Sequence, residues 1–142
     1  MILSFTILLI LIVLSGFFSG IETAFISLSE IDLIEIEKSN RKNRRILLHL
    51  LDNKEKLLST ILTCNNIVNI SASALNTILA PMYAPILGIS EGLSIILSAG
   101  VLTIVILLFS EITPKSIALY HNVELSLVFA PVISVISVLF SP

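Results

Sequence analysis

The sequence predicts an all-α membrane protein with three transmembrane helices, juxtamembrane amphipathic helices and a C-terminal helix that is interfacial or re-entrant. Of its 142 residues, 56 % are hydrophobic and 13 % are charged, whereas a soluble domain carries roughly 25 % charged residues. Seven of the eight Lys and Arg residues lie between Lys38 and Lys56, so the other stretches are almost free of charge. This pattern excludes a soluble enzyme domain, a disordered chain and a protein that binds nucleic acid through a basic face.

Three uncharged stretches are long enough to cross a hydrocarbon core of about 30 Å. They cover residues 1–21, 57–85 and 92–110, and they predict spans at about 2–28, 57–80 and 91–110. A cleaved signal peptide is the alternative for the first stretch, but it has neither a basic n-region nor a small-residue cleavage site. The segment at 80–91 holds Pro81, Pro85 and Gly88 and no Lys or Arg, which is typical of a short outer turn.

A fourth apolar stretch, residues 125–142, is interrupted by Pro131 and closed by Pro142. Its longest unbroken piece, residues 132–140, is too short to cross a bilayer, and such segments are usually interfacial or re-entrant. We therefore expect a helix at about 123–141 that lies at the membrane surface or dips into it.

The basic residues predict the orientation. Short loops rich in Lys and Arg stay in the cytoplasm, so residues 29–56 are expected inside, the N-terminus outside and the C-terminus cytoplasmic. Apolar residues recur at helical spacing in this loop, first at Ile31–Ile36 and again at Ile46–Leu51. That spacing predicts two amphipathic helices near the headgroups, with basic residues facing anionic lipid. A simple surface anchor is the alternative role for this segment.

Polar residues inside membrane spans need partners, and two of the spans have several. Ser15 and Ser19 share one helix face, and Gly16 and Gly20 give that helix a seam suited to close packing. In the second span Asn65, Asn69 and Ser73 are four residues apart, and Asn66 lies beside them. Hydrogen bonding between helices is the alternative for both sets, but so many amides exceed what holding two helices together requires.

The third span ends at Ser110 and Glu111, followed closely by Pro114. Because proline has no N–H, an α-helix here loses the bond to the carbonyl of Ser110. A carboxylate, a free carbonyl, hydroxyls and amide oxygens form the all-oxygen ligand set that Mg²⁺ prefers. The alternative is an ion pair between Glu111 and Lys115, one helical turn apart.

Three motifs resemble the transmembrane domain shared by bacterial CorC proteins and cyclin M (CNNM) magnesium transporters. They are LSGFFSGIETA at 14–24, ILTCNNIVN at 61–69 and SEITPKS at 110–116. The resemblance implies a homodimer with one Mg²⁺ per protomer, bound in an inward-opening cavity. Carried over to this chain, the ligands are Ser15, Ser19, Asn65, Asn69, the carbonyl at Ser110 and the Glu111 region.

Family members continue into a cytosolic pair of CBS modules that bind ATP, so this chain of 142 residues resembles the membrane domain alone. It departs from the family at two positions: Ser110 and Cys64 each stand where the family usually has glycine. The side chain of Ser110 is expected either to narrow the approach to the carbonyl or to add a hydroxyl ligand.

These observations lead to two hypotheses, neither of which is an enzyme. The first is export of Mg²⁺ through a dehydrated site, with exchange for Na⁺ as one driving force that the resemblance suggests. The second is a membrane scaffold or sensor that does not transport Mg²⁺ but reports it to a cytosolic partner. Membrane lipid is an expected partner under both hypotheses, and nucleic acid is not.

Overall fold

The computed structural model describes residues 2–139, and within them every regular element is a helix. The first helix is α1 (Ile2–Ile26), and two short helices follow it, α2 (Glu30–Lys38) and α3 (Arg44–Leu51). The long helix α4 (Lys54–Leu87) leads to α5 (Glu91–Val105), which continues through the π-helix η1 (Ile106–Ile112) into α6 (Thr113–Tyr120). The last helix is α7 (Asn122–Leu139).

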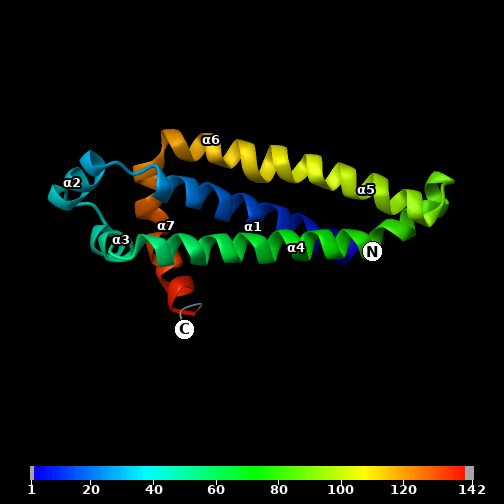
Figure 1. The fold of residues 1–142 in the computed structure, drawn as a ribbon, viewed down its shortest axis with the longest axis horizontal. Helices are drawn as coiled ribbons and strands as arrows, with labels where there is room; N and C mark the ends of the chain where they lie inside the picture. Colours follow the sequence, from blue (N-terminus) through cyan, green and yellow to red (C-terminus); the bar gives the residue numbers. More distant parts are fainter. Residues whose placement is uncertain (1, 140–142) are drawn as a thin grey trace.

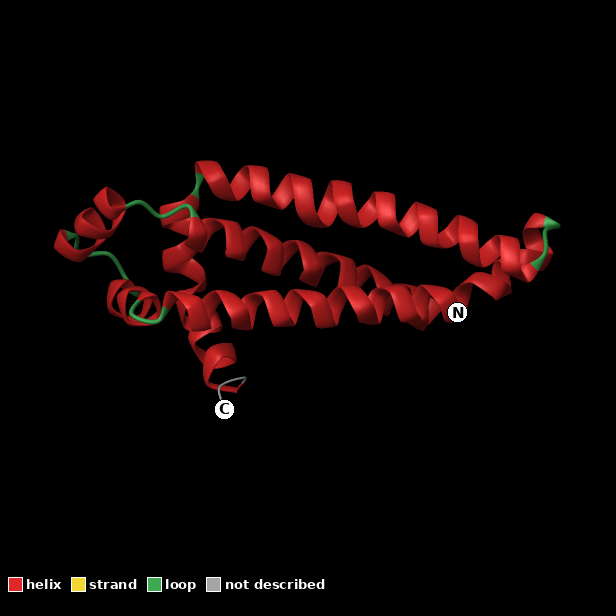
Figure 2. Cartoon of the chain, in the orientation of Figure 1, coloured by secondary structure: helices red, strands yellow, loops and turns green. Residues whose placement is uncertain are grey.

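Three long rods run side by side, formed by α1, by α4, and by α5 with η1 and α6 (Figure 1). The helix α7 crosses them near one end, and α2 and α3 lie at that same end (Figures 1 and 2). Four helical stretches within residues 2–139 are long and apolar enough to cross a membrane, and α7 is the fourth of them. Its crosswise course distinguishes it from the three rods.

The expected helices all form, with some shifts in their ends. The helix predicted at 123–141 is α7, and residues 140 and 141 lie outside the described residues. The two amphipathic helices predicted for 29–56 are α2 and α3. The face of α2 that meets the core carries Leu33 and Ile36, whereas Ile31 and Ile34 are exposed.

The turn predicted for residues 80–91 is shorter than expected, because α4 continues through Pro81 and Pro85 to Leu87. A proline inside a membrane helix is tolerated where a neighbouring helix supplies hydrogen bonds. The carbonyls that lose their helical donor are those of Thr77 and Pro81. Beside them the Ser94 hydroxyl of α5 donates to the carbonyl of Ala80 at 2.6 Å, which holds α5 against this part of α4. The turn itself comes at Gly88, whose φ of 65° lies in the left-handed region that favours glycine.

Two apolar clusters hold the rods together, one toward each end. The cluster beside α7 joins α1, α4 and α7, and it includes Ile21, Phe25, Leu57, Ile61 and Ile133. The cluster toward the opposite end contains Leu8, Ala72, Leu79 and Leu102, from α1, α4 and α5. Because Leu8 and Ala72 share one cluster while Phe25 and Leu57 share the other, α1 and α4 are antiparallel.

The start of α2 and the position of α7 depend on polar caps. Ser29 and Asp32 form a capping box, in which the hydroxyl and the backbone N–H of Ser29 hold the pKa of Asp32 below its ordinary value. The side-chain amide of Asn122 donates to the carbonyl of Ser27 at 3.0 Å. This bond attaches the beginning of α7 to the segment that follows α1.

Candidate functional site

The centre of the bundle holds a polar contact between α1 and α4. The Ser15 hydroxyl donates to Asn65 Oδ1 at 3.3 Å, and both side chains are buried. Two neighbouring ligands of an octahedral Mg²⁺ are about 3 Å apart, because each lies 2.0–2.1 Å from the ion. The spacing of these two oxygens therefore fits one edge of such a coordination shell.

The third rod reaches the same region through Ser110. Its hydroxyl donates to the carbonyl of Ile12 on α1 at 2.8 Å, and the residue has no exposed surface. This role was not expected for a serine at this position: the hydroxyl forms a hydrogen bond between two helices. The Ser110 side chain thus holds η1 against α1, one turn from Ser15.

The close approach of η1 and α6 to α1 depends on two glycines. A Cβ atom at Gly16 would lie 3.3 Å from Pro114 Cγ and 3.5 Å from the carbonyl oxygen of Phe109. A Cβ atom at Gly20 would lie 3.3 Å from Pro114 Cβ. The seam predicted from Gly16 and Gly20 therefore packs against Pro114 of the same chain.

Pro114 ends a stretch of π-helix rather than interrupting an α-helix. The N–H of Thr113 donates to the carbonyl of Leu108, five residues back. In this register the next bond would join residue 114 to the carbonyl of Phe109, and proline has no N–H to form it. The register thus moves the expected opening in the backbone from the Ser110 carbonyl to that of Phe109, which lies toward Gly16.

Two further predicted ligands have buried oxygens without a hydrogen bond. Within residues 2–139 the buried side-chain oxygens that lack a partner are Ser19 Oγ, Asn69 Oδ1 and Ser126 Oγ. An unpaired buried polar group costs free energy, so each such atom in a native protein needs an explanation. A cation would satisfy Ser19 and Asn69, since both supply oxygen.

The antiparallel helices place Ser19 and Asn69 on opposite sides of the Ser15–Asn65 contact. Each residue is one turn, or about 6 Å along the helix, from that contact. The two residues are therefore about 12 Å apart along the bundle, whereas two ligand oxygens on one Mg²⁺ are at most about 4 Å apart. Ser19 and Asn69 thus do not both reach one ion in this arrangement. The structure therefore brings together Ser15, Asn65 and Ser110 at the centre, with Ser19 and Asn69 on either side.

Glu111 lies beside this group and is partly exposed. The structure shows no ion pair between Glu111 and Lys115 within residues 2–139, so the alternative pairing of these two side chains is not present there. The rest of the asparagine stripe turns away from α1, since Asn66 and Ser73 are exposed. A spacing of eight residues drifts around a helix with 3.6 residues per turn, which explains Ser73.

The polar group is closed in this structure. Ser15, Ser19 and Ser110 have no exposed surface, whereas the family resemblance implies an inward-opening cavity. The bonds from Ser15 to Asn65 and from Ser110 to Ile12 draw the three rods together. Cys64, the second departure from the family, is buried in the apolar cluster beside α7.

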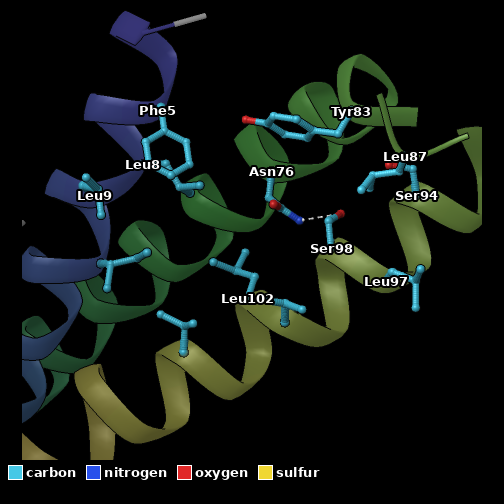
Figure 3. Close-up of a pocket in the computed structure, with 13 residues that line it drawn as sticks. Phe5, Leu8, Leu9, Asn76, Tyr83, Leu87, Ser94, Leu97, Ser98 and Leu102 are labelled. Atoms are coloured by element: carbon cyan, nitrogen blue, oxygen red, sulfur yellow. Dashed lines mark hydrogen bonds between the residues drawn. The ribbon is translucent and has the colours of Figure 1, made fainter. Parts of the chain in front are cut away.

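A separate cavity of about 410 Å³ lies between α1, α4 and α5, toward the end opposite α7. Its walls are mainly apolar, and Figure 3 shows Phe5, Leu8 and Leu102 around it. The Asn76 amide donates across it to the Ser98 hydroxyl at 3.2 Å. Because this amide is used between helices, Asn76 provides a comparison for Asn65. The sequence did not point to this cavity, which depends on how three distant segments pack.

Comparison with known proteins identifies the family of the chain. Residues 6–142 match the family model described as cyclin M transmembrane N-terminal domain. The chain is 36 % identical over 138 residues to a UPF0053 protein of Haemophilus influenzae, covering 97 % of this chain and 31 % of that protein. It is 36 % identical over 105 residues to the UPF0053 inner membrane protein YfjD of Escherichia coli, covering 74 % of this chain and 23 % of that protein.

A chloroplastic DUF21 domain-containing protein of Arabidopsis thaliana is 32 % identical over 136 residues, which cover 96 % of this chain and 20 % of the relative. The chain thus spans a third or less of the length of these relatives. The match covers nearly all of the helical bundle, including the polar contact between α1 and α4. The chain belongs to the family of cyclin M transmembrane N-terminal domains.

Proposed function

We propose that this chain is the membrane part of a transporter that exports Mg²⁺ through a dehydrated, all-oxygen site. The observation that carries the proposal is the buried contact between Ser15 Oγ and Asn65 Oδ1, with an unpartnered buried oxygen, Ser19 Oγ or Asn69 Oδ1, one turn away on each side. The family membership supports it. The proposed ligands are Ser15, Asn65, a backbone carbonyl at residues 109–110 and the carboxylate of Glu111. Ser19 or Asn69 joins them when α1 and α4 shift relative to each other.

The chemistry of this set favours a hard cation. Hydroxyl, amide, carbonyl and carboxylate oxygens suit Mg²⁺, whereas metals that prefer nitrogen or sulfur would find no such ligands here. Within residues 2–139 no three His, Cys, Asp or Glu side chains come together. Ligands must therefore come from neutral oxygens with one acid, and Na⁺ would use the same oxygen chemistry as a coupled ion.

The two apolar clusters suggest how access alternates. The ion site lies between the cluster that contains Ile21 and Leu57 and the cluster that contains Leu8 and Leu102. Entry from the α7 end requires α1 and α4 to separate at the first cluster, and release at the far end requires separation at the second. Opening one cluster while the other stays packed would move Mg²⁺ without a continuous pore.

In the membrane, the three rods are the proposed spans and α7 lies along the cytoplasmic surface. Seven basic residues between Lys38 and Lys56 support a cytoplasmic position for the α2–α3 end, because positively charged short loops stay inside. The N-terminus is then outside and the C-terminus inside. The crosswise course of α7 in Figure 1 suits a surface helix.

The proposed assembly is a homodimer. Asn66 is exposed on α4 within the apolar part of the chain, and an amide that faces lipid is costly. A second copy of the chain would give that amide a partner. In the longer protein we expect a cytosolic CBS pair that binds ATP, as the family resemblance implies.

The experiment is Mg²⁺ flux in proteoliposomes, with a Mg²⁺-sensitive dye inside the vesicles. Wild type is expected to move Mg²⁺ down its gradient, and Glu111→Ala is expected to abolish the flux. A protein that changes conformation on binding Mg²⁺ but moves none would instead be a sensor. That result would reject the transport proposal.

A further inference from the structure

The turn between α2 and α3 concentrates positive charge. Five of the eight residues at 38–45 are basic, and we call this group the basic turn: Lys38, Arg41, Lys42, Arg44 and Arg45. One acid offsets part of this charge, since Arg41 lies 3.5 Å from Glu35 in an exposed ion pair. Solvent screens such a pair strongly, so the turn stays electropositive.

The first turn of α3 adds to this positive potential. The first N–H groups of a helix have no partner inside it, and the helix dipole makes this end positive. Here the first turn holds no acid and begins with Arg44 and Arg45. The side chain of the N-cap residue, Asn43, forms no cap bond, and the residue has a φ of 67°.

The side chain of Asn43 is used elsewhere. Its amide donates to the carbonyl of Leu127 on α7 at 3.0 Å. The residue that could cap α3 thus joins the basic turn to α7, and the helix begins without a side-chain cap. An anion would satisfy both the N–H groups and the arginines.

The side chains form a hollow at this point. It has a volume of about 350 Å³ and is lined by Arg41, Arg44, Arg45, Ile46 and two asparagines. The guanidinium of Arg44 donates to the carbonyl of Ser39 across the turn. Arg44 also lines the hollow, and a guanidinium is well suited to binding phosphate through two bonds.

The neighbouring α7 indicates where the phosphate comes from. Its outer face has an exposed apolar stripe at Val128, Val132, Val135 and Val138, as expected for a helix in the membrane surface. The bond from Asn43 to Leu127 holds the basic turn beside that helix. Ile46, which lines the hollow, gives it an apolar edge.

We propose that the basic turn binds the phosphate of an anionic phospholipid from the cytoplasmic leaflet. The binding groups are the guanidinium groups of Arg41, Arg44 and Arg45, together with the positive end of α3, which has no side-chain cap. This inference rests on the orientation given under the proposed function but not on the Mg²⁺ site. It assigns the turn a specific ligand site rather than a general attraction to a charged membrane.

The test measures lipid binding to the full chain purified in a neutral detergent. The probes are dioctanoyl phosphatidylglycerol, dioctanoyl phosphatidylcholine and inorganic phosphate, with affinities from thermophoresis. Arg44→Gln with Arg45→Gln is compared with Lys54→Gln with Lys115→Gln, because both double variants lose two positive charges. Arg45→Gln alone serves as a milder change, and circular dichroism checks the helix content of each variant.

We expect phosphatidylglycerol to bind, and the double arginine variant to bind it at least tenfold more weakly. The lysine variant should change the affinity less than threefold, and Arg45→Gln should give an intermediate loss. Equal losses in the two double variants would overturn the proposal, since they would indicate general charge attraction. Equal binding of phosphatidylcholine, or competition by inorganic phosphate at the same concentration as the lipid, would also overturn it.

The same variants separate this inference from the proposed transport. Mg²⁺ affinity in the double arginine variant is expected to match wild type, because the basic turn contributes no ligand to the ion site. Loss of lipid binding with normal Mg²⁺ binding supports the inference. Loss of both would show that the turn maintains the fold, which overturns a separate lipid site.

Discussion

At the scale of single residues, the oxygens of Ser15 and Asn65 define the site. The sequence predicted both from their places on helix faces, and the structure joins them directly at 3.3 Å. It did not predict that the Ser110 hydroxyl would donate to the Ile12 carbonyl. That bond depends on how closely η1 approaches α1, and the spacing of residues along one helix carries no information about this distance.

The first prediction concerns Asn65. Replacing it with alanine removes an amide oxygen that no neighbouring side chain can replace, so Mg²⁺ affinity should fall by one to two orders of magnitude. Asn69→Ala should cost less, because Asn69 lies one turn from the Ser15–Asn65 contact. Isothermal titration calorimetry measures both affinities.

Asn76→Ala is the matched control for these variants. It also removes an asparagine from α4, but the amide of Asn76 donates to Ser98 at the apolar cavity. Its Mg²⁺ affinity is expected to equal that of wild type. A similar loss in Asn65→Ala and Asn76→Ala would show that the effect comes from general damage to α4.

At the scale of elements, the packing of α1 against η1 and α6 decides the geometry of the site. The small residues Gly16 and Gly20 predicted a close approach, and the structure shows Pro114 as the neighbour. The sequence also predicted a break at Pro114, but the rod continues through a π-helix instead. The missing N–H of Pro114 predicts that one backbone hydrogen bond is lost. Which carbonyl loses it depends on whether the helix is α or π at this point, and that depends on packing against α1.

The second prediction tests this packing. Gly16→Ala would add a Cβ atom 3.3 Å from Pro114 and 3.5 Å from a backbone oxygen, so the unfolding free energy should fall by roughly 1–3 kcal/mol. Gly100→Ala is the control, because a Cβ atom at Gly100 meets nothing within 4 Å. Alanine there should raise helix stability by roughly 0.5–1 kcal/mol.

Thermal unfolding in detergent compares the two variants. The account expects a lower midpoint for Gly16→Ala and an unchanged or higher midpoint for Gly100→Ala. If Gly16→Ala were as stable as wild type, α1 and η1 would be able to move apart far enough for the added methyl group without a loss of unfolding free energy. The close contact would then have no role in holding the ligands.

At the scale of the whole molecule, the sequence predicted the architecture well. Long uncharged stretches gave the three rods. The last stretch was expected to be interrupted at Pro131, but α7 continues through that proline as one helix of 18 residues, long enough to span a membrane. Only its crosswise course (Figure 1) distinguishes it from the rods. The direction in which α7 runs could not be predicted, because it depends on contacts with α1 and α3 that involve residues far apart in the sequence. Asn43 and Asn122 make two of those contacts.

The third prediction concerns orientation in the membrane. In a Cys64→Ala background, Lys42→Cys should react with a membrane-impermeant maleimide only after the membrane is opened. Ile89→Cys, in the turn after α4, should react in intact cells. The physical reason is that the basic segment stays in the cytoplasm.

The two orientations predict opposite labelling patterns for these two cysteines. Labelling of Lys42→Cys in intact cells, with protection of Ile89→Cys, would reverse the proposed orientation. Mg²⁺ would then enter the site from outside. The proposed lipid site would also lie on the wrong leaflet.

The central claim is that oxygens from three rods bind one divalent ion, and anomalous diffraction from crystals grown with Mn²⁺ tests it most directly. Mn²⁺ accepts the same oxygen ligands as Mg²⁺ and gives a measurable anomalous signal. The account predicts a single peak per chain, within bonding distance of Ser15 Oγ and Asn65 Oδ1. A peak elsewhere, with Ser15 still bonded to Asn65, would contradict it.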